Sequence, residues 1–94
     1  MPLSSRERRT LAARGNRLKA RVTIRADELS DAAVAHVRHA FGERELVKIR
    51  ISTDDREACD RAADQLRERV PCEVVQRVGR VVLLYRPSAE ADGE

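Results

Sequence analysis

Two hydrophobic periodicities alternate along this chain. In ELVKIRIS (residues 45–52), apolar side chains recur at every second position, which is the spacing of a strand with one buried face. Earlier in the chain, Val34, Val37 and Phe41 recur at helical spacing and predict an amphipathic helix. Helical and strand patterns that alternate in this way favour an α/β fold.

The predicted order of elements is α-β-α-β-α-β-β. Capping signals begin the three helices: Ser4 with Glu7, Ser30, and Asp54 with Glu57. The helices end at Gly15-Asn16, Gly42 and Pro71, and the predicted strands cover residues 21–24, 45–52, 73–77 and 81–85, with a tight hairpin turn at 78–80. Right-handed crossovers would place the second and third helices on one face of the sheet. We therefore expect a two-layer sandwich whose other face is at least partly open.

The strand at 45–52 contains cations as well as apolar residues. If Val47, Ile49 and Ile51 pack against the helices, Lys48 and Arg50 must project from the opposite face. The expected partner stripe on the third helix is Ala58, Cys59, Ala62, Leu66 and Val70. The two cations either protect an exposed sheet from aggregation or contact a ligand.

The distribution of charge favours the ligand. Residues 1–25 hold eight cations and one acid, although the whole chain has a net charge of only +3. A basic end without large apolar anchors suggests a nucleic acid before a membrane. Aromatic residues are limited to one Phe and one Tyr, so base stacking on aromatic rings is not expected to carry recognition.

Length and composition predict one domain over residues 1–87, followed by a disordered acidic tail over 88–94. The chain has no apolar run long enough to cross a bilayer and no signal-peptide pattern, so we expect a soluble, cytoplasmic protein.

Enzymatic and metal chemistry are not expected. His36 and His39 are spaced i, i+3, but Cys59 and Cys72 lie far apart without the short paired spacing of a zinc site. The sequence has no phosphate-binding glycine motif, and Asp54, Asp55 and Glu57 are interpreted as a helix cap. We predict a non-enzyme without cofactors.

Three stretches together resemble a known family: ERRTLAARGNRLKARVTI, RELVKIRI and VGRVVLLYRP. In this order and spacing they are similar to the YhbY-like CRM domain, which joins chloroplast RNA splicing factors with bacterial ribosome-maturation proteins. The resemblance covers about residues 4–87. It implies a mixed four-stranded sheet, similar to the C-terminal domain of bacterial translation initiation factor three. It also implies an RNA-binding function in the assembly of the large ribosomal subunit, with precursor rRNA as the partner.

One departure from the family concerns the loop after the first strand. The family usually has a G-x-x-G loop there, whereas this chain has Arg25-Ala26-Asp27-Glu28. Glycines allow a backbone to approach phosphates closely, and side chains obstruct that approach. Arg25 would have to replace part of the backbone contact with its side chain.

We predict that RNA contacts one basic surface on this domain. Its expected members are Arg14, Arg17, Lys19, Arg21, Arg25, Lys48 and Arg50, extended by Arg80 and Arg86 if the last strand lies close enough. Two alternatives remain open. One is a general nucleic-acid binder of the Alba type, although such domains begin with a strand. The other is a protein-interaction module that lost RNA binding together with the loop glycines.

Overall fold

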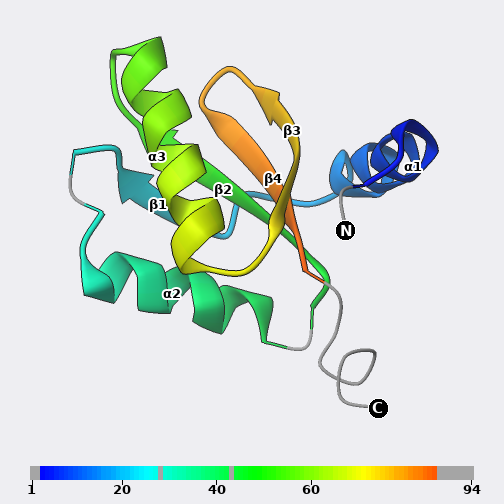
Figure 1. Cartoon of the computed structure of the whole chain (residues 1–94), viewed down its shortest axis with the longest axis horizontal. Helices are drawn as coiled ribbons and strands as arrows, with labels where there is room; N and C mark the ends of the chain where they lie inside the picture. The colour runs from blue at the N-terminus through cyan, green and yellow to red at the C-terminus, as the bar shows by residue number, and fades with distance from the viewer. Residues whose placement is uncertain (1–2, 28, 43, 87–94) are drawn as a thin grey trace.

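Four strands form one mixed sheet in the order β1-β2-β4-β3, with three helices around it (Figure 1). The computed structural model describes residues 3–27, 29–42 and 44–86. The elements are α1 (Ser5–Gly15), β1 (Val22–Arg25), α2 (Asp31–Phe41), β2 (Leu46–Ser52), α3 (Arg56–Arg69), β3 (Glu73–Val78) and β4 (Val81–Tyr85). The predicted order of elements and the α/β class with a mixed four-stranded sheet are confirmed.

The strand β2 lies inside the sheet, between β1 and β4. It pairs parallel with β1 and antiparallel with β4, while β3 pairs with β4 alone at the outer edge. The β3–β4 connection is a two-residue turn in which Gly79 has a φ of 60°. A positive φ at the first central position is what a type II′ hairpin requires, and glycine adopts it without steric cost.

The main core lies between one face of the sheet and the helices α2 and α3. Val47, Ile49 and Ile51 of β2 are almost completely buried there, against the predicted stripe of Val34, Val37 and Phe41 on α2. On α3 the buried residues are Cys59, Ala62, Ala63 and Leu66, with Val70 directly after the helix. The predicted register of β2 is therefore correct. The predicted stripe on α3 needs one correction: Ala63 is buried in it, whereas Ala58 is only half-buried.

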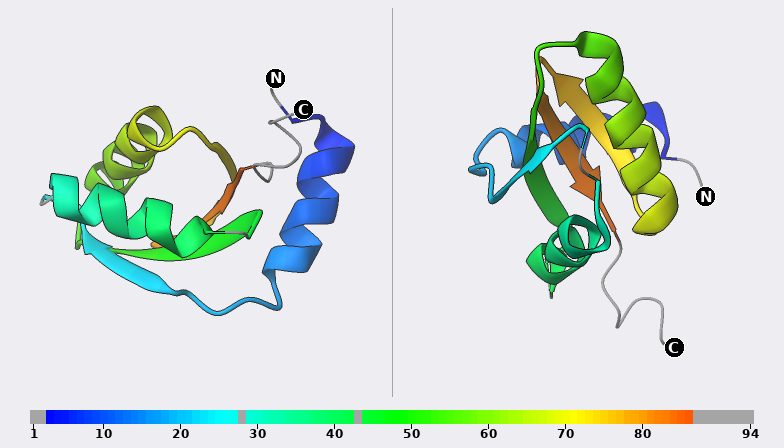
Figure 2. Two further views of the ribbon diagram at one scale, coloured as in Figure 1. Left: turned by 90° about the horizontal axis from the view of Figure 1, so that it is seen from below. Right: turned by 90° about the vertical axis from the view of Figure 1, so that its left-hand side faces the viewer.

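The helix α1 packs on the opposite face of the sheet (Figure 2). Its residue Leu11 forms a second small core with Leu46, Val75 and Leu83. The Arg8 guanidinium donates a hydrogen bond to the Val74 carbonyl at 2.5 Å, next to an irregularity in the β3 register. The second sheet face is thus covered at one end by α1, and only its remainder is open.

The helix caps are those predicted, with one correction. Ser4 and Glu7 form a reciprocal capping box on α1, and the Ser30 hydroxyl accepts a hydrogen bond from the Ala33 backbone N–H. The predicted cap of α3 at Asp54 is wrong: Asp55 is the N-cap, and its carboxylate accepts from the Glu57 N–H at 3.0 Å. The Thr53 hydroxyl accepts a hydrogen bond from the Asp55 N–H and so positions this residue.

Two predictions concern residues outside the described ranges. These are the disordered tail at 88–94 and the contribution of Glu28 to the loop after β1. Among the described helices, none has both the length and the apolar character needed to span a membrane.

Candidate nucleic-acid interface

Lys48 and Arg50 project from β2 on the face away from α2 and α3. Arg50 is exposed and lies between Thr23 of β1 and Val81 of β4, while Lys48 is half-buried beside Leu83. Within the described residues, neither cation forms an ion pair. Two unpaired cations in the middle of a sheet are available to an anionic ligand.

The segment between α1 and β1 brings further cations to this face. The Arg21 backbone N–H donates to the Lys48 carbonyl at 2.9 Å, which extends the β1–β2 pairing by one residue. Arg21 therefore lies beside Lys48 in the sheet. Arg17 and Lys19, which precede it, are also exposed. The structure thus brings together most of the predicted basic surface.

A groove of about 610 Å³ runs over the open part of this sheet face. We call it the face groove. Its cations are Lys19, Lys48 and Arg50, its neutral polar residues include Asn16, Thr23 and Gln76, and its apolar floor consists of Val78, Val81 and Leu83. The end of α1 and the segment after it form one wall.

A second groove, of about 930 Å³, lies where β1 and β2 end. We call it the end groove. It is lined by four arginines (Arg25, Arg50, Arg61 and Arg80) and two acids (Asp27 and Asp54). Thr23 and Arg50 line both grooves, so the two form neighbouring parts of one surface.

Arg61 is a candidate contact that the sequence analysis missed. It is exposed on α3 and faces the end groove together with Ala58 and Gln65. These three residues have the spacing i, i+3 and i+7, so they follow one side of a helix. That spacing was the available signal, but only the fold shows that this side borders the end of β2.

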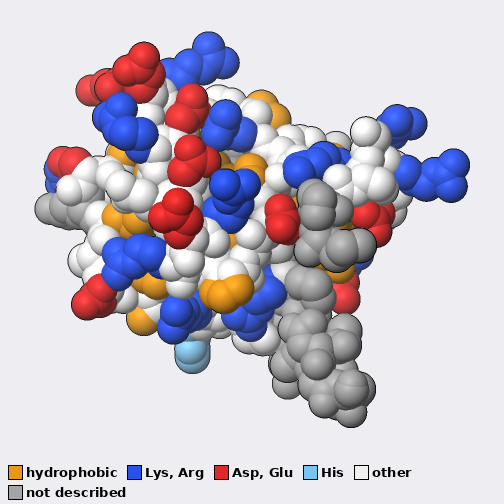
Figure 3. All heavy atoms as spheres, viewed as in Figure 1, with side chains coloured by type: hydrophobic (Ala, Val, Ile, Leu, Met, Phe, Trp, Pro, Cys, Tyr) orange, Lys and Arg blue, Asp and Glu red, His pale blue; other side chains and the backbone are white. Residues whose placement is uncertain are grey.

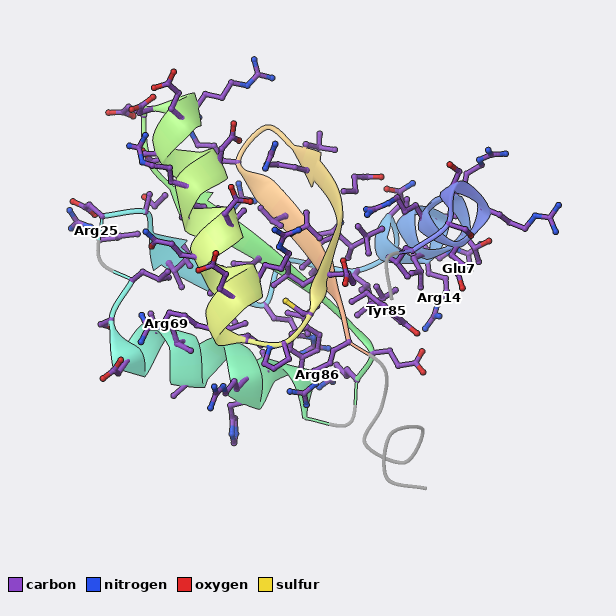
Figure 4. All side chains as sticks on the ribbon, viewed as in Figure 1. Glu7, Arg14, Arg25, Arg69, Tyr85 and Arg86 are labelled. Carbon is purple, nitrogen blue, oxygen red and sulfur yellow. The ribbon has the colours of Figure 1, made fainter. Side chains whose placement is uncertain are left out.

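Arg25 lies at the end of β1 (Figure 4). Its guanidinium forms an exposed ion pair with Asp27, with 3.4 Å between Nε and Oδ1. The chain after this loop is attached to α3 through Arg69, which donates to the Leu29 carbonyl at 2.9 Å and forms an ion pair with Asp31. Arg25 therefore enters the end groove with an acidic partner already beside it.

Arg14 and Arg86 lie away from the two grooves. Arg14 forms an ion pair with Glu45 at 3.5 Å, which connects α1 to the start of β2. The Arg86 guanidinium lies 5.1 Å from the centre of the Phe41 ring, a cation–π contact at the end of α2. Arg80 and Arg86 flank β4 at opposite ends, so only Arg80 extends the surface around Arg50.

The helix face of the molecule has a different charge pattern. Figure 3 shows acidic and basic side chains alternating over α3. The helix contains four acids and four arginines, so its net charge is zero. Asp60 additionally forms an ion pair with Arg77 at 3.1 Å. A polyanion gains little from this face compared with the unpaired cations on the sheet.

The residues considered for metal binding do not form a cluster. His36 and His39 are exposed on α2, whereas Cys59 is buried in the main core. No group of three or more metal-ligating side chains occurs within the described ranges. Burial, and secondarily the charge of Glu73, raise the pKa of the Cys72 thiol to about 11, so this thiol is unreactive near neutral pH.

Comparison with known proteins identifies a family and several relatives that resemble this chain. The sequence profile of the CRS1 / YhbY (CRM) domain matches residues 3–86. An RNA-binding protein of Haemophilus influenzae is 27% identical over 89 residues, which are 95% of this chain and 90% of that protein. A Pseudomonas aeruginosa protein, named as a probable RNA-binding protein, is 23% identical over 86 residues, covering 92% of this chain and 83% of the relative.

The fold has a counterpart among solved structures. The solution structure of a candidate RNA-binding protein from Staphylococcus aureus superimposes with a TM-score of 0.81. The alignment covers 93% of this chain and 91% of the other, at 21% sequence identity. At this level of identity the likeness establishes the fold.

Proposed function

This chain belongs to the CRS1 / YhbY (CRM) domain family, and from that premise we propose that it is a non-catalytic RNA-binding protein. More specifically, we propose that it acts in the cytoplasm on precursors of the large ribosomal subunit and contacts the rRNA backbone. The RNA-binding names of its relatives from Haemophilus influenzae and Pseudomonas aeruginosa support the first part.

The observation that carries the proposal is the position of Lys48 and Arg50. Both lack an ion-pair partner within the described residues, and Arg50 lies where the face groove meets the end groove. Phosphate groups along an RNA strand would contact these cations, and the counterions condensed on the RNA would be released into solution. Lys19 and Arg21 continue the same surface on one side, and Arg61 and Arg80 continue it on the other.

The altered loop after β1 favours a second candidate function. Asp27 partly neutralises Arg25, and residue 28 is an acid where the family usually has glycine. A chain with such a loop would bind phosphate weakly there. The protein would then act as a protein-interaction module in place of an RNA-binding protein. The remaining cations of the sheet face argue against this alternative, because Lys48 and Arg50 do not depend on the loop.

Binding measurements with the full chain separate these functions. We expect affinity for rRNA fragments that falls steeply with salt, together with weaker binding to duplex DNA of equal length. Equal affinity for duplex DNA would indicate a general nucleic-acid binder. Binding to neither would indicate the protein-interaction module.

The assembly role needs a separate experiment in cells. After sucrose-gradient fractionation of a lysate, the protein should travel with precursors of the large subunit. Its presence in free fractions only, with RNA binding intact in vitro, would leave an RNA-binding protein with another target.

A further inference from the structure

We propose that the face groove holds one unpaired nucleotide of the bound RNA. Its phosphate would lie on Lys48 and Arg50, and its base would lie across β4 and β3. This inference rests on the RNA binding proposed above and specifies the class of RNA: a strand with a bulged or otherwise unpaired nucleotide next to paired segments.

The sheet register places the required groups in two adjacent rows. One row runs from Arg50 through Val81 to Val78, and the next runs from Lys48 through Leu83 to Gln76. Neighbouring strands are about 4.8 Å apart, so each row extends about 10 Å from a cation on β2 to a neutral residue on β3. The groove therefore changes from cationic to apolar and amide-bearing along the direction in which a nucleotide extends from its phosphate.

The floor of the groove suits the flat face of a base. Val78 is 62% exposed and is the only large hydrophobic residue with such exposure among those described, and Val81 beside it is half-buried. Covering these side chains removes apolar surface from water. Neither Phe41 nor Tyr85 lines the groove, so the contact is with aliphatic side chains and not with aromatic rings.

The polar groups around this floor suit the edge of a base. The amides of Gln76 on β3 and Asn16 at the end of α1 each carry donors and an acceptor, and both line the groove. In a continuous duplex the base edges are already paired and the base faces are stacked, so a base reaches such groups only when it is unpaired. Recognition of unpaired bases in loops and bulges is the usual way in which proteins read RNA.

The end of α1 and the segment after it border the groove. Gly15 has no side chain and lies directly against Leu83, which allows the helix end to approach the sheet closely. Asn16 and Lys19, which follow this helix end in the chain, line the groove as well. The resulting volume of about 610 Å³ is within the range of small-molecule sites.

The test compares two RNA hairpins of equal length, one continuously paired and one with a single bulged nucleotide. The full chain should bind the bulged hairpin about tenfold more tightly, as expected for one or two additional hydrogen bonds with apolar contact. The double variant Gln76→Ala/Val78→Ser changes no charge and should bind both hairpins with about the same affinity. The control Gln65→Ala removes the same type of side chain, exposed in this case, from the end groove and should keep the preference.

Binding to the paired hairpin reports whether the double variant is folded, because this affinity should not change. Equal wild-type affinity for the two hairpins, with a normal salt dependence, would overturn the inference and leave the proposed function intact. Loss of the preference in Gln65→Ala but not in Gln76→Ala/Val78→Ser would also overturn it, because the nucleotide would then lie in the end groove. Absence of salt-dependent binding to either hairpin would overturn both proposals.

Discussion

Ile49 occupies the centre of β2 and has no exposed surface. It packs between α2 and α3 on one side of the sheet, while its neighbours Lys48 and Arg50 face the other side. This residue-by-residue alternation lets one short strand stabilise the core and carry the cations of the proposed interface. The alternation was visible in the sequence because a strand has a period of two residues.

The substitution Ile49→Ala tests the core side of this arrangement. It should lower the free energy of unfolding by about 2–5 kcal/mol, because it removes buried methyl groups and leaves a cavity. Urea unfolding measures this change, and the exposed Ser52→Ala on the same strand is the control. A loss below about 1 kcal/mol would contradict the complete burial of Ile49.

The stability of the folded protein should depend on pH through the thiol of Cys72. Burial is the main cause that raises the pKa of its thiol to about 11 from the unperturbed 9.0, and the charge of Glu73 adds to it. The unfolded chain loses this proton first as pH rises. The thiol therefore contributes stability that is fully present below pH 9.0 and is lost between 9.0 and about 11.

Alkylation followed by peptide mass spectrometry compares the reactivity of the Cys72 thiol in the folded and unfolded states. At a pH near 9, iodoacetamide should modify Cys72 much more slowly in the folded protein than in urea. The variant Cys72→Ala should show a smaller loss of stability than the wild type between pH 9.0 and about 11. Equal alkylation rates in the folded and unfolded states would show that folding does not raise the pKa of the Cys72 thiol.

At the scale of the elements, the packing of α1 against the sheet depends on one small residue, Gly15. A Cβ atom added to Gly15 would overlap the side chain of Leu83, which is itself buried. Gly15→Ala should therefore lower the free energy of unfolding by about 1–3 kcal/mol, the usual cost of overpacking, although alanine is the better helix former.

A double-mutant cycle separates the overlap from other effects. In a Leu83→Ala background, Gly15→Ala should cost little or become stabilising, because the overlapping atoms are gone. Equal costs in both backgrounds, measured by urea unfolding, would mean that α1 does not pack on Leu83.

The order and type of the elements could be predicted from local signals, but the position of α1 could not. Capping by Ser4 and Ser30 depends on neighbours within three residues, so it is visible in the sequence. The packing of α1 depends on Leu83, which lies far along the chain from Leu11. For the same reason Arg86 could not be assigned to the Phe41 ring, and Arg61 could not be assigned to the end groove.

At the scale of the whole molecule, the two faces of the sheet have different roles. One face is filled by α2 and α3, whose outer surface on α3 alternates acids and bases. The other is closed by α1 at one end and opens into the face groove at the other. Right-handed crossovers predicted the helix-covered face and the partly open face, but not the closure of one end by α1. The sheet register places Lys48 and Arg50 on the partly open face.

The salt dependence of RNA binding by two charge-matched variants tests the central claim most directly. Lys48→Gln/Arg50→Gln removes two cations from the sheet face, and Arg56→Gln/Arg67→Gln removes two exposed cations from α3. The logarithm of the binding constant falls as the logarithm of the salt concentration rises, and each lost phosphate contact should make this slope less steep by about 1. We predict that the sheet variant binds rRNA fragments more weakly, with its slope reduced by about 1–2, while the α3 variant keeps the wild-type slope. An unchanged affinity and slope in the sheet variant would contradict the account, because Lys48 and Arg50 would then only keep an exposed sheet from aggregating.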